Sequence, residues 1–259
     1  MLCAVWLALH AAAAPIAAAA DGADVSYPEC GKAYPVGQAF GIVDVNGGRP
    51  SDVNRCLASG LTWALGSPGF DFAFGPLVSL YVNTADPGPG TRHHPVVGWP
   101  HSGISAYGAC SGGSSPSCTY LYGEHHGAHA FDLAAVVDGP IAGAWPWWLD
   151  VETANSWVTS RTRGFSKLNT AATQGFVDGL RAAGAHGTVG IYSTPGDWVA
   201  ITGMSAETSR SYFPTEPDWV GGATTRKQAL GNCGVSFSGG RTLLAQYLAG
   251  AFDIDVRCL

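Results

Sequence analysis

Eight short apolar segments recur along residues 21–259, separated by helical or longer crossover segments. This alternation predicts an α/β fold, an irregular TIM-like (β/α)8 barrel. The length of residues 21–259 suits one large domain. A doubly wound open sheet is the alternative, but no glycine-rich phosphate-binding loop follows any of the early strands. The barrel is therefore the fold that we expect.

The predicted strands are short runs of apolar and β-branched residues bounded by turn-forming residues. They cover residues 23–26, 40–45, 77–82, 147–151, 188–192, 218–220, 243–247 and 252–256.

Two segments between the strands have clear helical features. Residues 51–65 follow Pro50 and begin with a Ser-Asp cap signal. Residues 167–183 have apolar side chains at helical spacing and end at Gly184. Residues 87–143 are rich in Gly, Ser, Pro and His, so we expect a long decorated crossover before the fourth strand.

The first 20 residues contain no charged side chain and lead through an alanine tract to Ala20. An apolar core followed by small residues is typical of a secretory signal peptide. The alternative, a membrane anchor, needs about 20 strongly apolar residues, and this alanine-rich segment is less apolar than that. We therefore predict a signal peptide over residues 1–20 and a secreted, monomeric barrel domain over residues 21–259.

The amino-acid composition argues against two classes of binding partner, nucleic acids and membranes. Charged residues make up 12% of the chain, the net charge is −6, and no basic cluster occurs. This balance argues against nucleic-acid binding. After residue 20 no second apolar run approaches membrane-spanning length, so we expect no membrane association after signal cleavage.

Cysteine usage fits an exported protein. Cys3 leaves with the signal peptide, and an even number of cysteines remains, which suggests disulfides. Fifteen connectivities are possible for six cysteines. Sequential pairing is the simplest, and zinc binding is disfavoured because no CxxC spacing occurs. The sequential pairs would be Cys30 with Cys56, Cys110 with Cys118, and Cys233 with Cys258.

The segment Trp147-Trp-Leu-Asp-Val-Glu152 is the strongest candidate for chemistry. Residues i and i+2 of a strand point to the same side, so Asp150 and Glu152 project together from the end of a buried strand. Two carboxyl groups buried side by side favour retention of a proton by one of them. This arrangement is suited to general acid and base catalysis.

Polar and aromatic side chains also occur near the ends of the other predicted strands. In a barrel of this kind the carboxyl ends of the strands form the active face. A single acid there is more often a turn cap, and an aromatic residue is as often ordinary core. The further candidates are Asp24, Asn83, Tyr192, Trp219, Gln246, Tyr247, Asp253 and Asp255.

Several of these motifs together resemble family 25 glycoside hydrolases, the Chalaropsis-type lysozymes. They are Gly22-Ala-Asp-Val-Ser26, Trp148-Leu-Asp-Val-Glu152, Gly190-Ile-Tyr-Ser193, Gln246-Tyr247 and Phe252-Asp-Ile-Asp255. Residues 40–50, 81–85 and 147–157 resemble more closely a group of secreted actinobacterial proteins with family-25-like domains.

The resemblance implies hydrolysis of a β-1,4 bond in peptidoglycan or a related cell-wall polysaccharide, without a cofactor or metal. Glu152 would be the general acid, and Asp150 would raise its pKa and orient the sugar. Asp24 and Asp253 would complete the acidic site. The side chains of Asn83, Tyr192, Trp219, Gln246, Tyr247 and Asp255 would contact the substrate.

Three departures from that pattern favour an alternative, a wall-binding domain that keeps the barrel but has no turnover. The second strand carries Asp44 and Asn46 before Gly47-Gly48, the crossover of residues 87–143 is long, and Gln246 lacks a preceding Trp.

A cluster of histidines, His125, His126 and His129, lies in the crossover. On a helix His125 and His129 would share a face and could hold a metal ion. Because the surroundings are rich in glycine, we predict a solvated loop instead.

Overall fold

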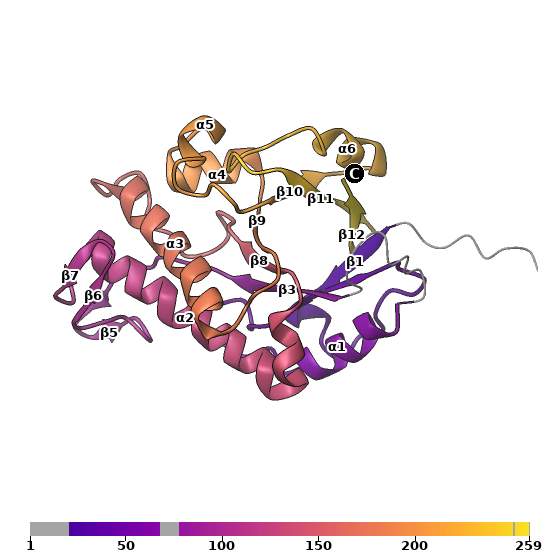
Figure 1. Ribbon diagram of the computed structural model, residues 1–259, viewed down its shortest axis with the longest axis horizontal. Coiled ribbons are helices and arrows are strands. Elements are labelled where there is room, and N and C mark those ends of the chain that lie inside the picture. The colour runs from indigo at the N-terminus through magenta and orange to yellow at the C-terminus, as the bar shows by residue number, and fades with distance from the viewer. Residues whose placement is uncertain (1–20, 68–77, 251, 259) are drawn as a thin grey trace, which may run out of the picture.

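A computed structural model describes residues 21–67, 78–250 and 252–258. Within these residues, eight strands close a barrel in the order β1-β12-β11-β10-β9-β8-β3-β2, with helices outside it (Figure 1). The predicted fold class is confirmed. The predicted signal peptide and Leu77, at the start of the third predicted strand, lie outside the described residues.

Every barrel strand overlaps a predicted one. The strands are β1 (Gly22–Val25), β2 (Gly41–Asp44), β3 (Val78–Asn83), β8 (Trp147–Asp150), β9 (Val189–Ser193), β10 (Asp218–Ala223), β11 (Thr242–Ala249) and β12 (Phe252–Arg257).

The last strand departs from a regular (β/α)8 barrel. β12 runs antiparallel to both of its neighbours, β11 and β1, whereas the other neighbouring strands pair in parallel. β11 ends at Ala249 and β12 begins at Phe252, and so short a connection permits only an antiparallel hairpin. The amino end of β12 therefore lies at the carboxyl ends of the other strands.

The helices and smaller hairpins occupy the connections. The helices are η1 (Tyr27–Glu29), α1 (Leu57–Leu65), α2 (Pro116–Asp138), η3 (Gly139–Gly143), α3 (Phe165–Ala183), α4 (Pro195–Thr202), α5 (Ala206–Ser209) and α6 (Arg226–Asn232). The hairpin strands are β4 (Gly90–Thr91), β5 (His94–Pro95), β6 (Gly103–Ser105) and β7 (Gly108–Cys110). In the described part of the chain, no helix has the length and apolarity needed to cross a membrane.

The predicted helix over residues 167–183 is confirmed as α3, but the one over residues 51–65 starts too early. Its helical part, α1, begins only at Leu57. Asn54 explains the delay, because its side chain donates to the Asp44 carbonyl at 2.8 Å and accepts from the Cys56 amide at 2.9 Å. These bonds hold the preceding residues in turns.

Helix α2 is the main element that the sequence did not predict. It lies inside the segment expected to be an irregular crossover, with Pro116 in its first turn and the Ser115 side chain accepting from the Cys118 amide. The histidine cluster is therefore helical, and the prediction of a solvated loop is wrong. His126 is buried, while His125 and His129 are exposed.

Glycines allow α2 to lie directly against α3, as Figure 1 shows. A Cβ on Gly123 would stand 2.1 Å from the carbonyl oxygen of Ala172 in α3. On the other helix, a Cβ on Gly175 would stand 2.1 Å from the Tyr120 carbonyl oxygen. Since no real Cβ fits at such distances, these glycines fix the separation of the two backbones.

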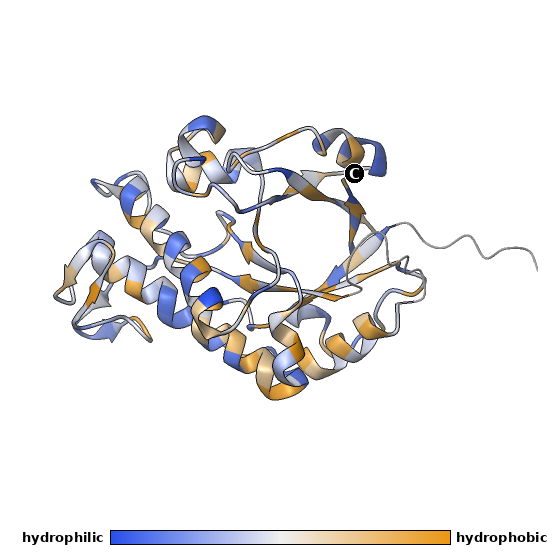
Figure 2. Ribbon diagram, in the orientation of Figure 1, coloured by the Kyte–Doolittle hydropathy of each residue, from blue (hydrophilic) through white to orange (hydrophobic). Residues whose placement is uncertain are grey.

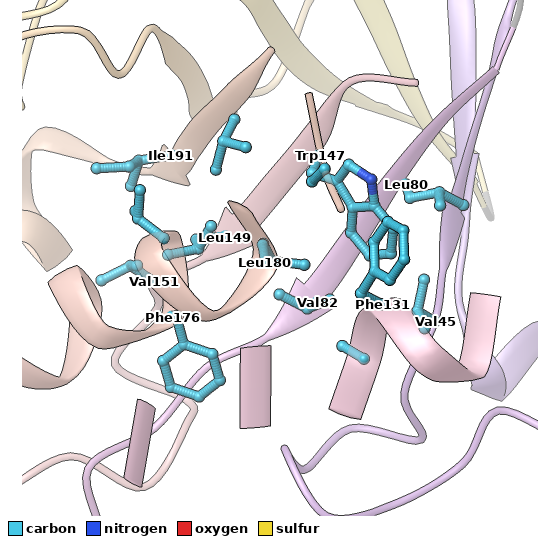
Figure 3. Close-up of a cluster of buried hydrophobic side chains, with 14 of the residues drawn as sticks. Val45, Leu80, Val82, Phe131, Trp147, Leu149, Val151, Phe176, Leu180 and Ile191 are labelled. Atoms are coloured by element: carbon cyan, nitrogen blue, oxygen red, sulfur yellow. The ribbon is translucent and has the colours of Figure 1, made fainter. Parts of the chain in front are cut away.

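Two hydrophobic layers follow from the alternation of side chains along the strands. Figure 3 shows the outer layer, which includes Leu80, Leu149 and Ile191 of the barrel strands together with Phe176 and Leu180 of α3. Figure 2 shows apolar residues along the barrel strands and mixed hydropathy on the helices. An inner layer fills the barrel below its carboxyl end and consists of Ala39, Phe40, Ile42, Tyr81, Trp148, Tyr192, Trp219 and Leu244.

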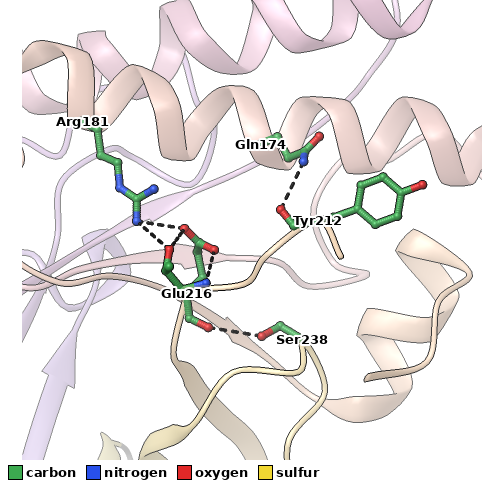
Figure 4. A network of polar contacts seen from close by, with 6 residues as sticks. Gln174, Arg181, Tyr212, Glu216 and Ser238 are labelled. Carbon is green, nitrogen blue, oxygen red and sulfur yellow. Dashed lines mark hydrogen bonds and ion pairs between the residues drawn. The ribbon is translucent and has the colours of Figure 1, made fainter. Parts of the chain in front are cut away.

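Polar contacts connect α3 to the chain that precedes β10 (Figure 4). Arg181 forms an ion pair with the buried Glu216 at 2.9 Å, and the Gln174 amide donates to the Tyr212 carbonyl at 3.2 Å. Ser238 donates to the Glu216 carbonyl at 3.4 Å. The side chain of Glu216 is thus paired, as a buried carboxylate requires.

The three disulfides join Cys30 to Cys56, Cys110 to Cys118, and Cys233 to Cys258. The predicted sequential pairing is confirmed. The last bridge joins the end of α6 to the residue after β12, which anchors the final strand of the barrel.

Substitution of Gly123 by Ala tests the contact between α2 and α3. We expect a loss of about 1–3 kcal/mol in the free energy of unfolding, because the new methyl group meets a backbone carbonyl that cannot move alone. Chemical denaturation measures the change. The control is Gly231→Ala in α6, where a Cβ meets nothing within 4 Å and stability should not fall. Equal stability of the two variants would contradict this description of the contact.

Candidate functional site

A cavity of ≈ 530 Å³ opens at the carboxyl end of the barrel. Five carboxyl groups line it, on four strands or directly after them: Asp24, Asp44, Asp150, Glu152 and Asp253. Its other polar and aromatic walls include Ser26, Tyr27, Tyr81, Asn83, Tyr192, Thr194, Trp219 and Gln246. The cavity thus brings together eight of the ten residues that the sequence singled out.

Asp150, the last residue of β8, and Glu152, two residues after it, both line the cavity. Burial, followed by the charge of Glu152, raises the pKa of Asp150 well above its usual range. Asp150 is the more deeply buried of the two groups; the interaction between them raises the pKa of Asp150 further and lowers that of Glu152. Asn155 supports this geometry with its amide, which lies 3.4 Å from the Asp150 carboxyl.

The pKa of Glu152 is also raised, but the cause differs from the predicted one. Burial contributes most, followed by the charge of Asp197, whereas the hydrogen bond from Asp150 lowers the pKa of Glu152. Glu152 is only half-buried. It therefore combines a raised pKa with access to the cavity, which are the properties of a general acid.

Asp24 and Asp253 form the opposite side of the site. They are direct cross-strand partners of β1 and β12, so their side chains lie next to each other. Burial and the charge of Asp253 raise the pKa of Asp24 to about 8. Gln246 donates to Asp24 at 2.9 Å and accepts from the Tyr192 hydroxyl at 2.7 Å, which fixes all three side chains.

Asp44 is a site residue that sequence reasoning missed. Its side chain is fully buried, and burial raises its pKa well above the usual range. It accepts from the Asn83 amide at 3.1 Å and from the Asn46 backbone at 3.2 Å, and Asn46 accepts from the Asn83 backbone at 2.8 Å. The sequence contains one feature that could have identified this residue. Asp44 ends the second apolar strand, just as Asp150 ends the fourth.

Trp219 and Tyr192 form the floor of the cavity. Their ring centroids are 4.5 Å apart, and Trp219 lies 5.8 Å from Trp148. With 2% of its surface exposed, Trp219 is chiefly a core residue whose edge meets the cavity. By contrast, Tyr27 at the rim is 49% exposed and offers a ring face to a ligand.

Two residues that were predicted to contact the substrate, Asp255 and Tyr247, do not line this cavity. Asp255 lies outside the cavity lining, is fully buried, and accepts from the Trp219 indole at 3.0 Å. Tyr247 points to the outside of the barrel, where its hydroxyl donates to Asp21 at 3.2 Å. The strand alternation explains the second error, because Gln246 and Tyr247 are adjacent and only one of them can face inward.

Among the described residues, no group of three His, Cys, Asp or Glu side chains is arranged to hold a metal ion. Burial lowers the pKa of His126 to about 4, so its ring is neutral at physiological pH.

The comparisons with known proteins support the fold. No protein-family model and no curated protein matches the sequence. Among solved structures, a bacterial lysozyme from Streptomyces coelicolor is similar with a TM-score of 0.53 at 14% identity, over 92% of both chains. The modular autolysin LytC from Streptococcus pneumoniae is similar with a TM-score of 0.54 at 12% identity, over 91% of this chain and 46% of that one. The chain therefore has a barrel similar to that of these two proteins, as its family-25-like motifs predicted.

The raised pKa of Asp24 predicts a dependence of stability on pH. An unfolded aspartate loses its proton near 3.9, but folded Asp24 keeps it up to about 8. Between these values the folded state binds more protons, so the free energy of unfolding falls as the pH rises. Asp24→Asn removes this contribution and should raise Tm above that of the wild type at pH 8 but not at pH 4.

A gain of about 1–2 kcal/mol at pH 8 corresponds to roughly 2–8 °C. The control is Asp132→Asn on the exposed side of α2, which should leave the pH profile of Tm unchanged. A Tm difference between Asp24→Asn and wild type that is constant from pH 4 to pH 8 would argue against a buried, protonated Asp24.

Proposed function

We propose that this protein is a secreted glycosidase that hydrolyses β-1,4 bonds of peptidoglycan or a related cell-wall glycan. The observation that carries the proposal is the gathering of Glu152, Asp150, Asp24 and Asp253 around one open cavity. Two opposed carboxyl groups across a glycosidic bond are the usual machinery of glycoside hydrolysis. The similarity of the barrel to those of a lysozyme and an autolysin agrees with this chemistry.

In the proposed mechanism Glu152 protonates the leaving oxygen. Its raised pKa keeps a proton available, and its position lets it reach a bound sugar. Asp150 has a positioning role beside Glu152: its interaction with Glu152 lowers the pKa of that carboxyl group, which stabilises the anion that remains after proton transfer.

Asp253 acts from the opposite wall. It is more exposed than Asp24, whose pKa of about 8 leaves it protonated near neutral pH. Burial and then the charge of Glu29 raise the pKa of Asp253 as well. Because Asp253 is the more exposed of the two acids, we assign to it the stabilisation of positive charge at the anomeric carbon or the binding of the attacking water. The hydrogen-bonded pair of Gln246 and Tyr192 keeps Asp24 beside it.

The remaining walls suit a carbohydrate. Asn83 and Thr194 present polar groups, and the exposed ring of Tyr27 provides a stacking surface at the rim. The three disulfides support secretion into an oxidising compartment. We further propose that residues 21–259 act as one monomeric domain.

The experiment that tests the function compares wild type with Glu152→Gln on purified cell-wall preparations. Wild type should release reducing ends, and Glu152→Gln should reduce the rate by about 10²–10⁴-fold, because the neutral amide cannot donate a proton in the same way. Glu207→Gln, at an exposed position on α5, is the matched control and should retain full activity.

If wild type released no reducing ends from peptidoglycan or from chitin-type oligomers, the glycosidase proposal would fail. Retained binding to the same glycans would then favour the alternative, a wall-binding domain without turnover.

A further inference from the structure

A second cavity, of ≈ 450 Å³, opens beside the acidic one at the same end of the barrel. It is built from the loops that follow β2, β3 and β8, together with the end of β5, the two residues after it and one residue of α2. Its lining includes Gly48, Arg49, Pro50, Ser51, Thr84, Ala85, Pro87, Pro95, Val96, Val97, Tyr122, Ala154, Asn155 and Ser156.

The two cavities adjoin each other. Asn83 lines the first and the next residue, Thr84, lines the second. Tyr27 lines the first cavity and packs on Gly48 of the second, where a Cβ would stand 2.5 Å from the Tyr27 ring. Tyr27 therefore lies at the boundary between the two cavities.

The charge of the second cavity is opposite to that of the first. Arg49 is the only charged residue in its lining, and its exposed guanidinium has no ion-pair partner within the described residues. The nearest acid in the sequence is Asp52, whose backbone N–H donates to the Arg49 carbonyl at 3.0 Å. Asp52 does not line the cavity, and no ion pair joins its carboxylate to Arg49 within the described residues. Arg49 therefore supplies the charge of this cavity with no acid in the lining.

The cavity has both polar and apolar walls, and ring contacts hold its floor in place. Pro87, Pro95 and Val97 contribute aliphatic surface, and Tyr122 forms part of the floor. The Tyr122 ring lies 4.4 Å from that of His126, measured between centroids, and 5.5 Å from that of Trp99. Such a preformed site costs little ordering on binding.

We propose that this second cavity binds an acidic peptide substituent of the glycan chain whose sugar occupies the acidic cavity. The inference rests on the proposed function and names its substrate as a peptide-bearing glycan. A guanidinium binds a carboxylate through charge-assisted hydrogen bonds, and proline and valine walls accept small aliphatic side chains. A plain sugar polymer offers neither group.

The test is equilibrium binding, measured by titration calorimetry, of soluble glycan fragments with and without their peptides. Glu152→Gln serves as the background, so that fragments stay intact during the measurement. We expect the Glu152→Gln variant to bind peptide-bearing fragments about tenfold more tightly than peptide-free ones, as one charge-assisted contact implies. Adding Arg49→Gln to this variant should remove the preference for peptide-bearing fragments. It should leave the affinity for peptide-free fragments unchanged.

Arg55→Gln is the matched control, because Arg55 is an exposed arginine of the same loop that does not line the cavity. It should keep the preference. Val97→Asp, at a position that is 70% exposed, adds an opposing charge to the wall and should weaken binding of peptide-bearing fragments alone.

The inference would be overturned if the protein bound both kinds of fragment with equal affinity. It would also be overturned if Arg49→Gln lowered the affinity for both kinds equally. The proposed function would survive that outcome if wild type still hydrolysed peptide-free strands. Conversely, a peptide preference without hydrolysis by wild type would support the second cavity as a peptide site and reject the glycosidase proposal.

Discussion

The antiparallel pairing of β12 with β1 closes the barrel and determines where the acidic groups lie. It makes Asp24 and Asp253 cross-strand partners and places Asp255 deeper in the barrel, beside Trp219. The parallel strands bring Asp44 and Asp150 to the same end. Because these carboxyl groups share a partly desolvated space, their pKa values rise together. The same closure thus creates the cavity and keeps protons inside it.

Buried acids oppose folding, so other parts of the molecule must offset them. The tight contact of α2 with α3, the outer hydrophobic layer and three disulfides all lie away from the cavity. Within the site, amides from Asn83, Asn155 and Gln246 hold the carboxyl groups in place. The stabilising shell and the destabilising acidic centre are therefore separate regions of one fold.

Strand periodicity predicted most of the barrel and of the site, because inward and outward positions alternate along each strand. The Asp-x-Glu segment of β8 is the clearest case. Helix α2 was not predicted because its close packing against α3 requires glycines such as Gly123. A glycine-rich composition is otherwise typical of loops. Tyr247 was misplaced because the register that turns Gln246 inward turns its neighbour outward. The role of Asp44 depends on a network with its neighbour Asn46 and with Asn83, and Asn83 is distant in sequence.

The proposed chemistry depends on the presence of protonated carboxyl groups in this cavity at neutral pH. Carbon-13 NMR of the aspartate and glutamate carboxyl groups, followed from pH 3 to pH 9, measures it directly. We expect carboxyl resonances that still titrate above pH 7, one of which disappears in Asp24→Asn. Complete titration of every carboxyl group below pH 5.5 would contradict this expectation.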